Sequence, residues 1–190
     1  MREPGPVVLA AGRVRLEPLA EAHTAQLFEV AGDDDIWRWV SVRRPHTLQD
    51  MTAIVGQSRA EPGRLPFAVV VEGRAQGSTS YLDIDTGVGG LEIGWTWYAR
   101  PLWATEVNPQ CKLLLLEHAF DTLGAGRVSL KTDIMNTRSQ AAIRKLGARY
   151  DGTLRHHKLR SDGSVRDTVY FSIVAEEWPT VRAGLEARLR

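Results

Sequence analysis

The sequence lacks several features that would define a function class. It contains one cysteine, Cys111, which excludes an internal disulfide and any metal centre built from several cysteines. Its 24 Lys and Arg side chains and 23 Asp and Glu side chains nearly cancel, giving a net charge of +1. This balance gives no indication of a nucleic-acid or membrane-surface partner. Because no metal-ligand spacing is present either, we expect no metal site.

Long hydrophobic runs are also missing. The apolar stretches are far too short to cross a bilayer. The N-terminal stretch MREPGPVVLAAG lacks both the charged leader and the long apolar segment of a signal peptide. We therefore expect a protein that acts in the cytoplasm.

Apolar residues are nevertheless frequent enough for one substantial core. With 190 residues, of which 43% are hydrophobic, residues 1–190 are expected to form a single domain. Periodicity and turn residues predict an α+β fold in which strands and helices are mixed. The expected strands are 12–19, 67–73, 75–85, 89–99, 127–134 and a hairpin over 149–174, and the expected helices are 20–32, 33–40, 47–60, 110–120, 137–148 and 176–190.

The strand at 89–99 carries both apolar and chemically useful side chains. Side chains on a strand alternate between its two faces. A regular alternation places Leu91, Ile93, Trp95 and Trp97 on one face and Glu92, Thr96 and Tyr98 on the other.

After this strand, a polar loop over 100–108 leads into the apolar helix 110–120. A helix N-terminus attracts anions, because its free backbone N–H groups and its dipole both point at the ligand. Such loops usually contain glycines, which let the backbone approach a phosphate. This loop has none, and Ala104 and Glu106 stand in its centre.

Three segments carry a family resemblance: LEIGWTWYARPLW, RVSLKTDIMNTRSQAAIRKLGA and GTLRHHKLRSDGSVRDTVYFSI. With the order of elements, they make residues 12–188 resemble the GCN5-related N-acetyltransferases (GNAT), and more narrowly the RimJ/RimL-like branch. The most specific block is N-x-x-S-x-x-A-x-x-x-L-G, here formed by Asn136, Ser139, Ala142, Leu146 and Gly147.

The resemblance implies a GNAT fold, a mixed and mostly antiparallel sheet of about seven strands flanked by helices. Strands four and five, here about 90–98 and 127–133, would splay apart in a V. Acetyl-CoA would lie in that V, with its pantetheine arm along the fourth strand and its pyrophosphate on the following helix. The residues implied to bind it are Trp95, Trp97, Trp103, Ala104, Thr105, Glu106, Val107, Asn108, Asn136 and Ser139.

The loop departs from the family pattern Q/R-x-x-G-x-G/A, because Ala104 and Glu106 replace two glycines. A carboxylate at position 106 would repel the doubly negative pyrophosphate. Two other interpretations stay open. Glu106 points to solvent with its charge offset by Arg100 or Lys112, or it caps its own helix and fills the anion site.

Acetyl transfer to an amine requires a base for the ammonium, stabilisation of an oxyanion and a proton for the leaving thiolate. We assign Glu92 as the general base, acting through water, and the resemblance implies Ser139 as the general acid, with Tyr98 in reserve. The alternatives are a solvated carboxylate for Glu92, a first-turn helix serine for Ser139 and simple packing for Tyr98. Asn136, implied to bind pantetheine, has the alternative of capping its helix.

Aromatic residues suggest walls for the acceptor pocket, although most aromatic residues lie in cores. The expected substrate-binding residues are Trp37, Trp39, Tyr81 and His157.

The leading hypothesis is an N-acyltransferase that moves an acetyl group from acetyl-CoA to a primary amine of a small molecule or a protein N-terminus. The alternatives are a GNAT-fold protein with another acyl donor or other chemistry, and a non-catalytic binding module. Similar proteins suggest a possible homodimer.

Overall fold

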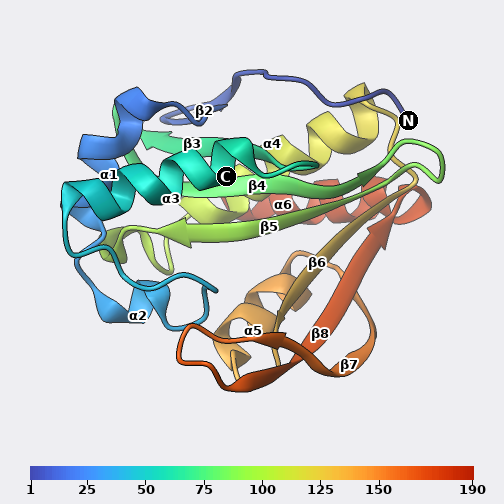
Figure 1. The fold of residues 1–190 in the computed structure, drawn as a ribbon. Coiled ribbons are helices and arrows are strands. Elements are labelled where there is room, and N and C mark those ends of the chain that lie inside the picture. The colour runs from blue at the N-terminus through green and yellow to red at the C-terminus, as the bar shows by residue number, and fades with distance from the viewer.

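The computed structural model describes all of residues 1–190. One open sheet of eight strands runs through the molecule in the order β1-β2-β3-β4-β5-β6-β8-β7 (Figure 1). Its strands are β1 (Leu9–Ala11), β2 (Val14–Pro18), β3 (Leu65–Val71), β4 (Arg74–Asp85), β5 (Gly90–Tyr98), β6 (Arg127–Asp133), β7 (Arg149–Leu159) and β8 (Val165–Val174). The expected mixed sheet is confirmed, with the three-residue β1 added at its edge.

Helices cover both faces of this sheet. They are α1 (Thr24–Val30), α2 (Asp34–Trp37), α3 (Leu48–Ala60), α4 (Val107–Glu117), α5 (Thr137–Lys145) and α6 (Trp178–Leu189). The larger apolar core packs α4 and α6 against one face, and a smaller core packs α1 and α3 against the other. None of these helices combines the length and the apolar character that a membrane span requires.

Local sequence signals account for several element ends. Thr47 caps α3, because its hydroxyl accepts a hydrogen bond from the Asp50 N–H at 3.1 Å, and the Asp50 carboxylate accepts one from the Thr47 N–H at 2.8 Å. The segments expected as helices at 20–32 and 33–40 are more broken. A 3-10 turn at Glu21–His23 precedes α1, and α2 spans only four residues.

A β-bulge in β5 corrects the expected alternation. Ser80 pairs with Gly94 but Ser78 pairs with Trp97, so β5 holds one extra residue, and Trp95 has a positive φ of 51°. Tyr98 consequently joins Leu91 and Ile93 in the larger core, whereas Trp97 packs in the smaller one. The prediction that Trp97 shares a face with Leu91 and Ile93 was wrong, because a bulge reverses every later side chain.

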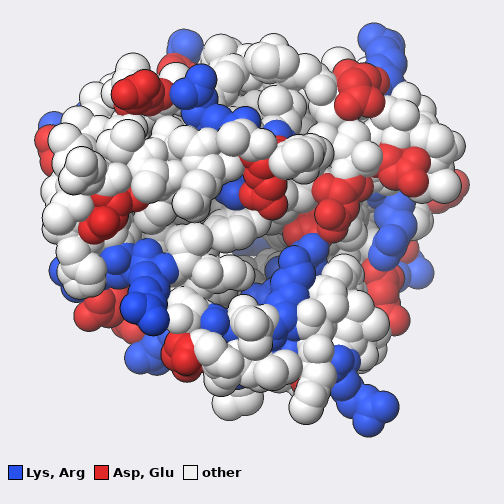
Figure 2. Space-filling view, viewed as in Figure 1, with Lys and Arg blue, Asp and Glu red and all other residues white.

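The two central strands separate as the family resemblance implies. β5 and β6 run parallel and pair only at Gly90, Leu91 and Glu92 of β5. Beyond that point β6 pairs with β8 alone, and β5 pairs with β4 alone. β5 therefore diverges in a V from the arm formed by β6 and β8 (Figure 1). The surface is hollowed where they part, and we call this hollow the opening (Figure 2).

Candidate active site

Glu92 stands at the vertex of the V, because it is the last residue of β5 that pairs with β6. Its side chain is 2% exposed, and Oε2 lies 2.5 Å from Lys131 Nζ on β6. Burial raises the pKa of the Glu92 carboxyl, while the charge of Lys131 opposes that rise. Lys131 also contacts Asp83 of β4, with Nζ 3.2 Å from Oδ2. The vertex therefore holds a buried carboxylate whose pKa is raised by burial and which is paired with one lysine.

The arm opposite β5 presents a polar face to the same opening. Lys131 is paired in register with Tyr170, and Asp133 with Thr168. Because alternate residues share a face, Arg166 of β8 lies on it as well. Sequence reasoning named His157 of this cluster but missed Lys131, Asp133 and Arg166. The alternation of Ser129, Lys131 and Asp133 with mainly apolar residues was the signal that would have found the two residues on β6.

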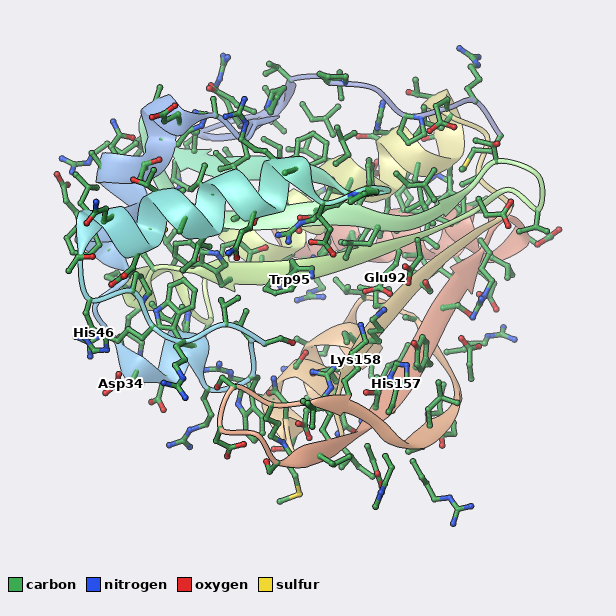
Figure 3. All side chains as sticks on the ribbon, viewed as in Figure 1. Asp34, His46, Glu92, Trp95, His157 and Lys158 are labelled. Atoms are coloured by element: carbon green, nitrogen blue, oxygen red, sulfur yellow. The ribbon has the colours of Figure 1, made fainter.

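His157 belongs to this cluster. Its ring lies 5.8 Å from that of Tyr170, and its Nδ1 is buried without a hydrogen-bond partner. Burial and the nearby charge of Lys158 lower the pKa of His157. In Figure 3, His157 and Lys158 lie across the opening from Glu92. The structure thus brings His157 to the same opening as Glu92, as its assignment to the acceptor site requires.

The contacts of Glu106, in the loop before α4, decide between the three interpretations of its side chain. The Glu106 carboxylate forms an ion pair with Arg13, which directly precedes β2, and the Glu106 side chain is 48% exposed. Neither Arg100 nor Lys112 pairs with it, and its side chain does not cap α4. Glu106 therefore shares with Glu72 a cation that lies 93 residues away from Glu106 in the sequence.

The backbone of this loop keeps one property of the missing glycines. Ala104 has a φ of 61°, in the left-handed region that glycine normally occupies. Fewer N–H donors remain free than in a glycine-rich loop. The Val107 N–H donates to Thr105 Oγ1 at 3.3 Å, and Pro109 has no N–H. Asn108 faces inward, where its Oδ1 accepts a hydrogen bond from the Tyr98 hydroxyl at 3.0 Å.

Trp103 is held between two cations beside the V. The guanidinium of Arg100 lies 4.3 Å from the ring centroid, and that of Arg138 on α5 lies 3.5 Å from it. The indole N–H donates to the Tyr98 carbonyl at 3.0 Å. Trp103 therefore links the loop before α4 to α5, across the opening. Arg138 was not anticipated from the sequence, because the contact joins distant segments.

The start of α5 combines two predicted residues. Asn136 is buried, and its Oδ1 accepts a hydrogen bond from the Ser139 N–H at 3.1 Å, so it caps α5. The Ser139 side chain is half-buried in the first turn. The capping interpretation of Asn136 is confirmed. Contacts of either residue with a ligand stay predictions.

Besides Trp97, three aromatic residues expected in the site lie in the cores instead. The Tyr98 side chain is buried beneath α4, and burial raises its pKa well above its ordinary value. The Tyr81 hydroxyl donates to the Leu115 carbonyl at 2.5 Å, and the Trp37 indole N–H donates to the Ala31 carbonyl at 2.8 Å. The polar atoms of these three side chains already have hydrogen-bond partners within the protein. Their positions therefore favour packing over the catalytic or binding roles expected for them.

Trp39 and Trp95 are both half-buried, unlike the buried Trp37 and Trp97. Trp95 follows the vertex on β5, and the guanidinium of Arg64 lies 4.5 Å from its ring (Figure 3). Together with Trp97, Trp95 lines a small apolar pocket under α3. An apolar wall therefore continues from the vertex along β5.

A family model described as "Acetyltransferase (GNAT) domain" matches residues 13–149. The chain therefore belongs to the GNAT family of acetyltransferases. No curated protein matches its sequence.

Solved structures agree with this assignment. A candidate acetyltransferase from T. thermophilus is 37% identical, with a TM-score of 0.92 over 99% of this chain and 100% of that one. A GCN5-related N-acetyltransferase from Brucella melitensis is 26% identical, with a TM-score of 0.94 over 98% of this chain and 87% of that one. Mycobacterium smegmatis RimJ, solved with CoA-disulfide, is 25% identical, with a TM-score of 0.81 over 98% and 94% of the two chains.

Proposed function

We propose that this protein transfers an acetyl group from acetyl-CoA to a primary amine, carried by a small molecule or a protein N-terminus. The proposal rests mainly on the position of Glu92, a buried carboxylate at the vertex of the V. An acceptor amine is protonated at neutral pH and must lose a proton before it can attack a thioester. A carboxylate with a raised pKa suits that task better than a solvated one.

The residues around the opening fit an anionic donor such as acetyl-CoA. Arg13 withdraws the Glu106 carboxylate to the side of the loop, and Ala104 adopts a backbone conformation typical of glycine. Arg138 places a guanidinium group beside Trp103 and makes no ion pair, whereas Arg100 is already paired with Asp35 at 3.2 Å. We expect the start of α4 and Arg138 to hold the donor.

The donor supplies an activated acetyl thioester when bound. Glu92 accepts the proton of the ammonium group through water, and Lys131 keeps the carboxylate charged until that transfer. Beyond the vertex, β6 leaves the edge of β5 unpaired, so N–H groups near Trp97 remain to polarise a carbonyl oxygen. Ser139 is the donor of a proton to the leaving sulfur. We expect this reaction in the cytoplasm, and a homodimer remains a proposal.

A second candidate is transfer from a different acyl donor. It is favoured by the loss of N–H donors at Val107 and Pro109, which reduces the number of groups that can bind a pyrophosphate. A donor without that group would need fewer such contacts.

Calorimetry with acetyl-CoA separates the two candidates when the native protein is compared with Glu106→Gly. Micromolar binding by the native protein supports acetyl-CoA as the donor. Binding that appears only in the variant would contradict it and would favour another donor.

A further inference from the structure

The face opposite Glu92 contains more positively charged side chains than there are carboxylates to pair with them. Lys131, Lys158 and Arg166 lie near two acidic groups, Glu92 and Asp83, and both of these contact Lys131. Figure 2 shows Lys and Arg side chains along the hollow in the centre of the molecule, below a group of acidic side chains. The remaining two cations have no carboxylate of their own.

Lys158 and Arg166 are direct neighbours across the β7–β8 ladder, where they form a register pair. Like charges at directly opposite positions of an antiparallel pair destabilise a sheet. Arg166 is only 9% exposed, and its one hydrogen bond runs from Nε to Thr168 Oγ1 at 3.1 Å. Lys158 makes no ion pair at all. A costly pair of cations without a partner indicates that something outside the chain neutralises them.

The nearest other carboxylate does not serve this purpose. Asp133 already accepts two hydrogen bonds from Arg160, at 2.7 and 3.1 Å. Two buried polar atoms without a hydrogen-bond partner also lie here: His157 Nδ1, and Glu92 Oε2, which has only its ion pair with Lys131. Unsatisfied buried atoms are uncommon and often mark a site that a ligand or water completes. They provide an observation independent of the charge count.

We propose that the acceptor is an amine that also carries an anionic group, bound with its ammonium at Glu92 and its anion at Lys158 and Arg166. This inference rests on the proposed function, because that function makes the amine the acceptor of the acetyl group. Binding of an amine that carries an anion can nevertheless be tested without the donor. A carboxylate or a phosphate beside the amine satisfies both cations. Arg166 supplies the guanidinium fork that suits either anion, and Lys158 supplies a point charge.

The test uses matched pairs of amines that differ only in the anion. The pairs are 4-aminobutyrate with butylamine, phosphoethanolamine with ethanolamine, and the amidated dipeptides Ala-Glu and Ala-Gln. They distinguish a carboxylate, a phosphate and an acidic peptide N-terminus. Binding of each probe to the full-length protein is measured by ligand-observed NMR without acetyl-CoA, and acetyl transfer is then measured with it.

The anionic member of at least one pair is expected to bind about tenfold or more tightly than its neutral partner, as for a charge-assisted hydrogen bond. Lys158→Gln weakens that preference, and Lys158→Glu reverses it. Lys158 is exposed, so both variants are expected to fold. Arg166→Gln is the second test of the same site. Arg155→Gln is the matched control, because Arg155 is an exposed cation of the same strand that has no partner in the cluster.

Equal binding within all three pairs, or no binding by any probe, would overturn the inference. A preference that survives Lys158→Glu would do so too. A preference that depends on Lys158, together with no acetyl transfer, would uphold the recognition site while refuting acetyl-CoA as the donor. The two proposals therefore fail in different measurements.

Discussion

Arg13 on the approach to β2 forms an ion pair with Glu106 at the N-terminus of α4. The pair places a cation on a carboxylate of the loop that is expected to bind a pyrophosphate. Both side chains are partly exposed, so the contribution of the pair to stability is small. Its consequence is electrostatic, because it decides whether the loop presents a free negative charge to an anionic donor.

Removing Arg13 should therefore weaken acetyl-CoA binding. In Arg13→Gln the Glu106 carboxylate loses its cation, and the dissociation constant is expected to rise about two- to fivefold, as for an exposed charge pair. Adding Glu106→Gln to that variant should restore the affinity. Arg15→Gln is the control, since Arg15 lies two residues further along the chain and pairs with Glu17 instead. Equal calorimetric affinities for the native protein and Arg13→Gln would exclude this role for the ion pair.

Gly94 sets the position of the Glu92 carboxylate. A Cβ built at Gly94 would lie 2.5 Å from Glu92 Oε1 and 2.8 Å from Leu82 Cδ1, so an alanine there must displace the carboxylate. Gly94→Ala should lower kcat about tenfold to hundredfold, as a misplaced catalytic group does, and leave acetyl-CoA affinity unchanged. Gly56→Ala on α3 is the control, because no atom lies within 4 Å of its built Cβ. A Gly94→Ala enzyme with native kcat would contradict the placement of Glu92.

Lys131 controls the pH at which Glu92 becomes a base. Burial raises the pKa of Glu92, whereas the charge of Lys131 lowers it. Lys131→Met removes only the lowering contribution, so the pKa of Glu92 rises further. The deprotonated form then appears at higher pH, and the acidic limb of the kcat/KM profile should shift upward. Lys145→Met, an exposed lysine on α5, should leave the limb in place. A shift toward lower pH, or none, would refute Glu92 as the base.

Much of the fold follows from local signals in the sequence. The capping box of Thr47 and Asp50 begins α3 as expected, and the alternation of residues 127–133 gives β6. The bulge at Trp95 was not predicted, because neither the composition nor the spacing of β5 marks the extra residue. It reverses the side chains after Gly94, and so it moved Tyr98 from the expected site into the core.

The site was only partly predictable for a related reason. Glu92 was identified because it is a carboxylate on a strand of the recognised family pattern. Its partners Lys131 and Asp83 come from two other strands, and the clamp of Arg138 on Trp103 joins α5 to a loop. Periodicity describes one element at a time. Contacts between elements depend on register and packing, which no single segment encodes.

The role of Glu92 is tested most directly by the release of free thiol from acetyl-CoA in the presence of an accepted amine, compared between the native protein and Glu92→Gln. We expect amine-dependent release by the native protein. In Glu92→Gln we expect a loss of about 10²- to 10⁴-fold, the usual contribution of a general base, with donor affinity retained. Native turnover in Glu92→Gln, or thiol release that does not depend on the amine, would contradict this role.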